Sequence, residues 1–187
     1  MTKTAREKML TGELYLASDP ELVEMTLRAQ RILHDFNQSQ PDAVDQRRSL
    51  IQALFKSVGF GCEIKPPFCC DYGSHIAVGN RVFVNYGCVV LDCAAVKIGD
   101  RTLLGPKVQI YTASHPLEPD KRKAGWEFAL PVEVGNDVWL GGGVIVCPGV
   151  TIGAGATIGA GSVVTKDVPA GVLAVGNPCR VVRQLPK

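Results

Sequence analysis

Aliphatic residues recur at every sixth position through much of this chain, and this repeat is the strongest constraint on its fold. The longest unbroken run is Val134, Leu140, Val146, Ile152, Ile158 and Val164. Two earlier runs keep the same step, namely Val78, Val84 and Val90, and Ile98, Leu104 and Ile110. A six-residue unit holds one short strand and a turn, and it cannot bury its apolar side alone. The repeat therefore predicts a parallel β-solenoid of stacked three-sided coils, each about eighteen residues long, with the aliphatic side chains pointing to the axis.

Glycine directly follows many of the aliphatic residues, as at Gly135, Gly141, Gly153 and Gly159. We expect these glycines to let the chain turn corners at low steric cost. The step between Val90 and Ile98 is eight, so two residues are extra there.

The repeat is interrupted between Ile110 and Val134 and then resumes in phase. The interrupting segment, IYTASHPLEPDKRKAGWEFALP, is rich in charged residues, proline and glycine. We expect residues 112–132 to form an arm that leaves one corner of the solenoid. Long loops on a rigid scaffold often carry function. His115 lies where the arm begins, and Pro116 stiffens its exit.

Residues 1–59 have a different pattern, which predicts a helical hairpin with one apolar face. Ser18 and Glu21 have the spacing of a capping box, with Pro20 in the first turn. Apolar residues follow at helical spacing up to Phe36, and a second amphipathic run extends from Val44 to Val58 and stops at Gly59. We expect this segment to pack on the solenoid of residues 60–187.

Composition excludes several function classes. The net charge of +2 and the aromatic content of 6% give neither the basic stripe nor the stacking residues of a nucleic-acid binder. No window resembles a signal peptide or a membrane span, so a cytoplasmic location without membrane association is expected. The seven cysteines match no zinc-binding spacing and are expected to be reduced, mostly buried thiols.

The three histidines do not suggest a metal centre. A three-histidine zinc site would need His34, His75 and His115 to converge, although His34 belongs to the helical segment and His75 to the first coils. No metal site is therefore predicted. The residues alone leave His115 open between an ordinary polar loop residue and a general base.

Several segments resemble the maltose and galactoside O-acetyltransferases, a family of hexapeptide-repeat acyltransferases. They are CDYGSHIAVGNRVFVNYGCVVLDCAAVKIGD, IYTASHP, VWLGGGVIVCPGVTIGAGATIGAGSVVTKDVPAG and GNPCRVVR, together with the helical start KMLTGELYLASDPEL. The resemblance covers nearly the whole chain. It implies a left-handed parallel β-helix, whereas the general rule for parallel crossovers favours right-handed ones.

The resemblance also assigns acceptor-side roles. It implies that His115 is the catalytic base and that Asn85 orients the acceptor hydroxyl or helps hold the tetrahedral intermediate. Asp71 matches a position that hydrogen-bonds the sugar, as in the maltose enzyme. The galactoside enzyme has an acidic sugar contact where this chain has Cys93, which argues against a galactoside acceptor. Asp92 beside it is retained in a role that the resemblance does not define.

The resemblance further implies that acetyl-CoA is the acetyl donor, and that the C-terminal tail contributes to its binding. The matching positions are Gly142, Ala160, Thr165, Lys166, Arg180 and Arg183. Trp139 either lines the cleft or packs. A homotrimer with sites between subunits is expected. The expected function is transfer of acetyl to a sugar of the maltose or glucose type. A xenobiotic or lipo-oligosaccharide acceptor, and a non-catalytic scaffold, are the alternatives.

Overall fold

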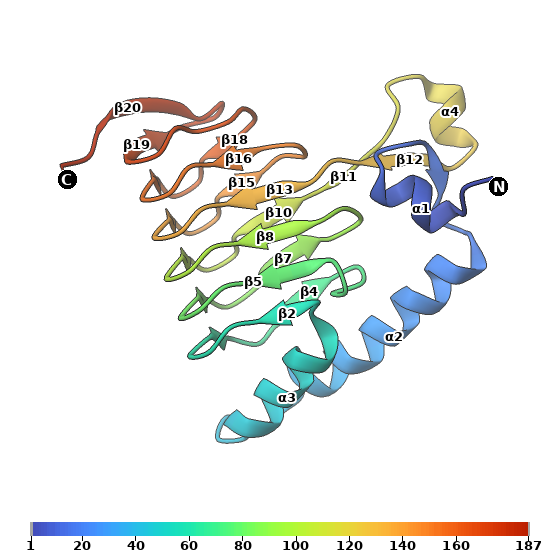
Figure 1. The fold of residues 1–187 in the computed structure, drawn as a ribbon, viewed down its shortest axis with the longest axis horizontal. Coiled ribbons are helices and arrows are strands. Elements are labelled where there is room, and N and C mark those ends of the chain that lie inside the picture. The colour runs from blue at the N-terminus through green and yellow to red at the C-terminus, as the bar shows by residue number, and fades with distance from the viewer. Residues whose placement is uncertain (1, 187) are drawn as a thin grey trace.

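The computed structural model describes residues 2–186, and most of them form a parallel β-helix with three flat walls (Figure 1). The first wall consists of β2 (Ser57–Val58), β5 (Ile76–Val78), β8 (Val96–Ile98), β13 (Val132–Val134) and β16 (Thr151–Ile152). The second wall consists of β3 (Glu63–Ile64), β6 (Phe83–Val84), β9 (Leu103–Leu104), β14 (Trp139–Leu140), β17 (Thr157–Ile158), β19 (Val172–Val175) and β20 (Arg180–Gln184). The third wall consists of β4 (Phe68–Cys70), β7 (Cys88–Leu91), β10 (Gln109–Tyr111), β15 (Ile145–Val146) and β18 (Val163–Val164).

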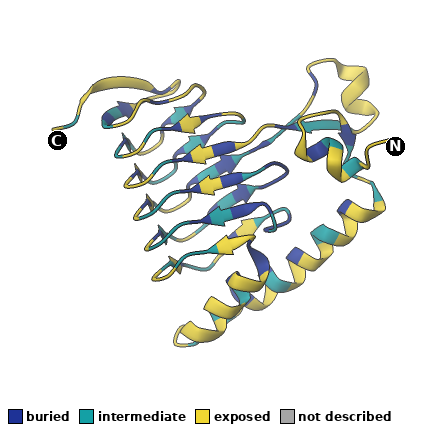
Figure 2. Cartoon of the chain, viewed as in Figure 1, coloured by how far each residue is buried: buried dark blue, intermediate teal, exposed yellow. Residues whose placement is uncertain are grey.

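The predicted register of the repeat is confirmed. Ile152, Ile158 and Val164 are all completely buried, and the other repeat positions from Val78 onward are buried as well. Their strand neighbours point outward, so buried and exposed residues alternate along each wall (Figure 2). One continuous apolar core therefore runs along the axis of the β-helix.

The explanation expected for the repeat glycines is wrong. Positive φ occurs two residues after the glycine, and non-glycine residues adopt it at Arg81, Arg101 and Asp137. The glycines are instead required by close stacking of the coils. A Cβ at Gly99 would lie 2.6 Å from the backbone nitrogen of Asn136, and one at Gly135 would lie 2.6 Å from that of Ala154. Any side chain there would push two coils apart.

The insertions into the repeat lie at one corner, where the chain passes from the third wall to the first. Residues 71–75 connect β4 to β5, and residues 92–95 connect β7 to β8. The longest insertion, residues 112–131, connects β10 to β13 and forms the predicted arm. We call this edge of the β-helix the insertion corner.

The arm is more ordered than a solvated loop. It contains β11 (Ala113–Ser114), the short helix α4 (Pro119–Lys123) and β12 (Trp126–Ala129). β12 pairs with β11 on one side and with β1 (Tyr15–Leu16) on the other, both in antiparallel orientation. The start of the chain thus completes a three-stranded sheet with the arm, which the prediction of an all-helical residues 1–59 missed.

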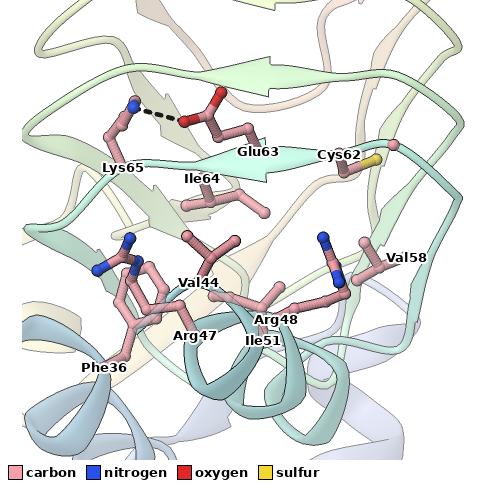
Figure 3. Close-up of a pocket in the computed structure, with 11 residues that line it drawn as sticks. Phe36, Val44, Arg47, Arg48, Ile51, Val58, Cys62, Glu63, Ile64 and Lys65 are labelled. Atoms are coloured by element: carbon pink, nitrogen blue, oxygen red, sulfur yellow. Dashed lines mark ion pairs between the residues drawn. The ribbon is translucent and has the colours of Figure 1, made fainter. Parts of the chain in front are cut away.

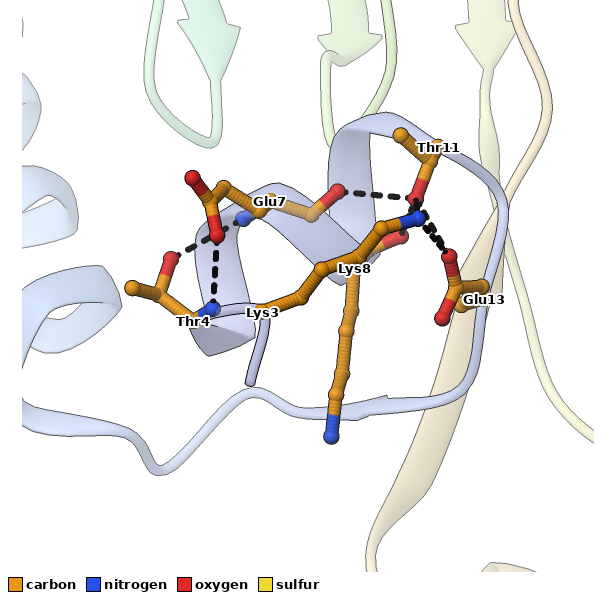
Figure 4. A network of polar contacts seen from close by, with 6 residues as sticks. All are labelled: Lys3, Thr4, Glu7, Lys8, Thr11 and Glu13. Atoms are coloured by element: carbon orange, nitrogen blue, oxygen red, sulfur yellow. Dashed lines mark hydrogen bonds and ion pairs between the residues drawn. The ribbon is translucent and has the colours of Figure 1, made fainter. Parts of the chain in front are cut away.

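Helix α1 (Ala5–Leu10) packs beside this sheet. Its first turn is closed by a capping box in which the Glu7 N–H donates to the Thr4 hydroxyl and the Thr4 N–H donates to the Glu7 carboxylate (Figure 4). At its end, the Thr11 hydroxyl donates to the Glu7 carbonyl at 2.9 Å. These bonds fix the helix that leads into β1.

The predicted helical hairpin is present as α2 (Pro20–Asn37) and α3 (Val44–Leu54), which cover the first coil (Figure 1). The N-cap of α2 is Asp19 rather than Ser18, because the Asp19 side chain accepts the Glu21 N–H at 3.0 Å. The second helix ends at Leu54, earlier than predicted, and Val58 belongs to β2. No helix within residues 2–186 is both long and apolar enough for a membrane span.

Candidate active site

His115 directly follows β11, is exposed, and lines an open cleft of about 590 Å³. The cleft is lined by Ser114, Pro116, Leu117, Glu118 and Lys121 from the arm, and by Leu14 and Phe128. The pairing of Ser114 with Phe128 across β11 and β12 sets the point at which His115 leaves the sheet. The imidazole is therefore carried by a short, paired segment and can face solvent and a ligand.

Asp71 and Cys93, both considered for the acceptor side from the sequence, meet at the insertion corner. The Cys93 thiol donates a hydrogen bond to the Asp71 carboxylate at 3.3 Å. Cys93 is buried and Asp71 is half-buried. Burial raises the pKa of Asp71 to about 6, against the opposing effect of the thiol bond. Asp71 is thus a desolvated carboxylate on the same corner as the His115 arm.

Asp92 has no exposed surface. Its carboxylate accepts the backbone N–H of Tyr72 at 2.8 Å and that of His75 at 3.2 Å. The ring of His75 donates from Nδ1 to the Asp92 carbonyl at 2.7 Å. Asp92 therefore holds the 71–75 loop in place, and its oxygens are occupied by that loop.

Tyr15 and Glu127 were not recognised from the sequence. The buried phenol of Tyr15 donates a hydrogen bond to the Glu127 carboxylate at 3.0 Å. Tyr15 also packs in one apolar cluster with Tyr72 and Cys93. No local signal revealed this pair, because the two residues are 112 positions apart and meet only through the pairing of β1 with β12.

Asn85 lies on a different corner, where the chain passes from the second wall to the third. It is half-buried, and its side-chain oxygen accepts the Tyr86 N–H at 2.8 Å. Gly142 and Ala160 occupy the same corner in later coils. The third wall lies between this corner and the insertion corner, so the chain does not place Asn85 and Asp71 on one edge.

The remaining residues predicted to bind the donor are near the C-terminal end of the β-helix. Thr165 and Lys166 follow β18 at the insertion corner, and Arg180 and Arg183 lie on the edge strand β20. All four are exposed. Within residues 2–186, none of the three cations forms an ion pair with a carboxylate. Their charges are thus available to an anionic ligand.

A more enclosed pocket of about 400 Å³ lies between α3 and the first coil (Figure 3). Its lining residues lie between Phe36 and Lys65 and include none of the predicted site residues. Its cationic side chains already have partners. Arg47 donates to the carbonyls of Gln40 and Pro41, Arg48 pairs with Asp45, and Lys65 pairs with Glu63. The charges of this pocket are therefore balanced by neighbouring groups of the chain. Within residues 2–186, no cluster of three or more histidine, cysteine or acidic side chains is arranged to hold a metal ion.

The six-residue repeat and the parallel β-helix that it builds are those of the hexapeptide-repeat transferases. Residues 8–59 match the maltose acetyltransferase hexapeptide capping motif, and residues 131–166 match the bacterial transferase hexapeptide of six repeats. The chain superposes on a maltose O-acetyltransferase from Clostridium difficile 630 with a TM-score of 0.98 and 44% identity, covering 100% of both chains. It superposes on a galactoside acetyltransferase in complex with coenzyme A with a TM-score of 0.96 and 38% identity, covering 99% of this chain and 92% of the other.

Nodulation protein L of Rhizobium meliloti (strain 1021) is 49% identical over 181 residues, which are 97% of this chain and 99% of that protein. The chain belongs to the maltose/galactoside O-acetyltransferase family and is a hexapeptide-repeat acetyltransferase. This assignment removes the non-catalytic scaffold from the alternatives. The family placement agrees with the resemblance seen in the sequence and leaves the acceptor undefined.

Proposed function

We propose that the protein transfers the acetyl group of acetyl-CoA directly to a hydroxyl of a small sugar of the maltose or glucose type. The observation that carries this proposal is the position of His115. The imidazole lines an open cleft on the arm, and the arm leaves the same corner that holds the desolvated carboxylate of Asp71. A base and a hydrogen-bonding carboxylate on one corner of the β-helix are suited to a neutral, hydroxyl-rich acceptor.

In the proposed reaction, His115 takes the proton of the sugar hydroxyl as the oxygen attacks the thioester carbon. The carbonyl becomes an oxyanion, which the amide of Asn85 helps to hold. The carbon–sulfur bond then breaks, and the imidazolium returns its proton to the departing thiolate of CoA. No serine or cysteine nucleophile takes part, so no acyl-enzyme forms.

The donor is proposed to lie along the corner that carries Gly142 and Ala160, with its phosphates near Arg180 and Arg183 and near Lys166 on the insertion corner of a neighbouring subunit. The absence of a large side chain at Gly142 and Ala160 allows the pantetheine arm to approach the backbone. Thr165 adds a hydroxyl beside Lys166. This proposal is supported by the unpaired cations of the C-terminal coils and by coenzyme A in the related galactoside acetyltransferase structure.

We propose a homotrimer with each site between two subunits. The outer faces of two walls are mostly apolar, with Leu103 and Trp139 on the second wall 45% and 54% exposed. The first wall is charged instead, as in the ion pair between Lys97 and Glu133. Apolar walls that meet around a threefold axis would bury this surface. A neighbouring subunit would then bring a corner with Asn85 to the arm of His115. Light scattering that shows an active monomer would contradict the trimer.

Two observations bear on the choice between a galactoside and another acceptor. The nodulation protein L relative shares more identity with this chain than the galactoside acetyltransferase structure does. Cys93 also replaces an acidic residue that we expect at the sugar site of the galactoside enzyme. These observations favour an acceptor other than a galactoside, and the lipo-oligosaccharide considered from the sequence stays an alternative.

The test measures acceptor-dependent thiol release from acetyl-CoA with glucose, maltose, a galactoside, a lipo-oligosaccharide and a xenobiotic control. We expect glucose or maltose to give the highest kcat/KM, and the acetyl ester to be found on the sugar by mass spectrometry. A preference for the lipo-oligosaccharide would replace the proposed acceptor. No transfer to any sugar would overturn the proposed function.

A further inference from the structure

The N-terminal strand β1 and the arm are joined by one buried polar contact. Tyr15 and Glu127 are directly opposite each other in the antiparallel pairing of β1 with β12. Tyr15 is 1% exposed, and its hydroxyl donates to the Glu127 carboxylate at 3.0 Å. A buried phenol hydroxyl needs a partner, and the carboxylate supplies a charge-assisted one. The contact therefore favours a single position of β12 relative to β1.

This contact is linked directly to the cleft that contains His115. Leu14 precedes Tyr15 and Phe128 follows Glu127, and both of these neighbours line the cleft. Phe128 in turn pairs with Ser114, the residue before His115. A shift of β12 along β1 would thus move a wall of the cleft and the base itself.

Tyr15 also connects the arm to the insertion corner. It packs with Cys93 in the same apolar cluster, and the Cys93 thiol binds Asp71. Burial raises the pKa of the Tyr15 phenol, and the nearby Cys93 and Glu127 raise it further. The phenol therefore stays protonated and remains a donor across the pH range in which the enzyme is assayed. The side chain of Tyr15 therefore lies between the arm that carries the base and the insertion corner that carries the Asp71 carboxylate.

We infer that Tyr15 is a positioning residue that acts through Glu127 and sets the reach of His115 over the acceptor. Only the expected effect on kcat rests on the proposed function. The arm contact itself is a property of the fold. The N-terminal strand thereby has a role in acetyl transfer, although it contributes no reacting group.

Three variants separate this role from simple packing. Tyr15→Phe keeps the ring and removes the hydroxyl, Glu127→Leu removes the acceptor, and Glu127→Gln keeps an oxygen that accepts the phenol bond. Tyr111→Phe is the matched control, because the Tyr111 hydroxyl bonds to Gln109 within the same β-strand rather than to the N-terminal segment. The measurements are kcat, the KM of both substrates, and hydrogen exchange of residues 113–129.

We expect Tyr15→Phe and Glu127→Leu to lower kcat about tenfold, as the loss of one positioning hydrogen bond allows. The KM for acetyl-CoA should be unchanged, and exchange should accelerate in the arm but not in the walls. Glu127→Gln keeps a weaker, neutral bond and should lose clearly less than Glu127→Leu, and Tyr111→Phe should resemble the wild type. Wild-type kcat and arm exchange in Tyr15→Phe would overturn the inference. Equal losses in Glu127→Gln and Glu127→Leu would also overturn it, because the charge of Glu127 would then matter instead of its bond to Tyr15.

If the wild type acetylates no sugar, the proposed function fails, whereas hydrogen exchange still tests the arm contact. Faster exchange confined to the arm in Tyr15→Phe would then support the contact. Exchange equal to that of the wild type would overturn it. The failure of one proposal is thereby distinguishable from the failure of the other.

Discussion

The Cys93 thiol donates a hydrogen bond to the Asp71 carboxylate at 3.3 Å, across two successive coils of the β-helix. The two residues are 22 positions apart and follow neighbouring strands of the third wall. Their contact brings a buried thiol and a desolvated carboxylate to the corner from which the arm departs. The acceptor side of the site is therefore built from insertions in consecutive coils.

The raised pKa of Asp71 has a consequence for stability. Its folded pKa of about 6 is above the ordinary value of 3.8, so between these values the folded state binds more protons than the unfolded state. The free energy of unfolding contributed by Asp71 then falls as the pH rises from about 4 to about 6. Asp71→Asn should melt at a higher temperature than the wild type at pH 8, with the difference shrinking below pH 6. A difference independent of pH would contradict the burial of a charged Asp71.

Asp71 should also make acceptor binding depend on pH. If its carboxylate accepts sugar hydroxyls, protonation below about pH 6 should raise the acceptor KM of the wild type. Asp71→Asn should have a high acceptor KM that changes little with pH, and the KM for acetyl-CoA should not change in either protein. Steady-state kinetics from pH 5 to 8 provide the measurement. A wild-type acceptor KM that stays constant would remove Asp71 from the acceptor site.

Asp92 is predicted to act through the loop that it holds. Asp92→Ala leaves the N–H groups of Tyr72 and His75 without their acceptor, and each unsatisfied buried group costs about 1–3 kcal/mol. The melting temperature should fall, and the acceptor KM should rise because the loop also carries Asp71. Asp92→Asn retains one acceptor oxygen and should lie between Asp92→Ala and the wild type. An acceptor effect without a loss of stability would indicate direct contact with the sugar.

His115→Ala should lower kcat by about 10²–10⁴-fold, the usual effect of removing a general base. The KM for acetyl-CoA should stay near normal, since the imidazole is proposed to contact the acceptor hydroxyl. His34→Ala is the control, because His34 is exposed on α2. Equal kcat values in the two variants would show that the arm carries no base.

The sequence predicted the coils well and the arm poorly, for physical reasons. The aliphatic repeat residues are buried at a fixed spacing, so the local period alone is enough to place Val78 or Ile158 in the core. The sheet of β1 with β12 depends on pairing between distant segments, and neither segment belongs to a repeat along the chain. The same limit applies to Tyr15 and Glu127. The corner shared by Asp71 and Cys93 follows from the stacking of coils, which the repeat predicts, but their hydrogen bond does not.

The last prediction concerns the electrostatic part of donor binding. Acetyl-CoA carries a pyrophosphate and a 3′-phosphate, and Lys166 and Arg183 are exposed cations without a carboxylate partner within residues 2–186. We expect Lys166→Ala or Arg183→Ala to raise the KM for acetyl-CoA about three- to thirtyfold, or about 0.7–2 kcal/mol. The acceptor KM and the saturated kcat should stay within about threefold, because phosphate contacts are distant from the transferred acetyl group.

Salt should distinguish this effect from a structural one. The KM difference between each variant and the wild type should shrink as ionic strength rises, because the wild type then loses part of the same attraction. Lys97→Ala is the matched control, since Lys97 is an exposed cation of the first wall that pairs with Glu133. Its KM for acetyl-CoA should equal that of the wild type at every salt concentration. If Lys166→Ala and Arg183→Ala also match the wild type throughout, the basic end of the chain does not bind the donor and the phosphates lie elsewhere.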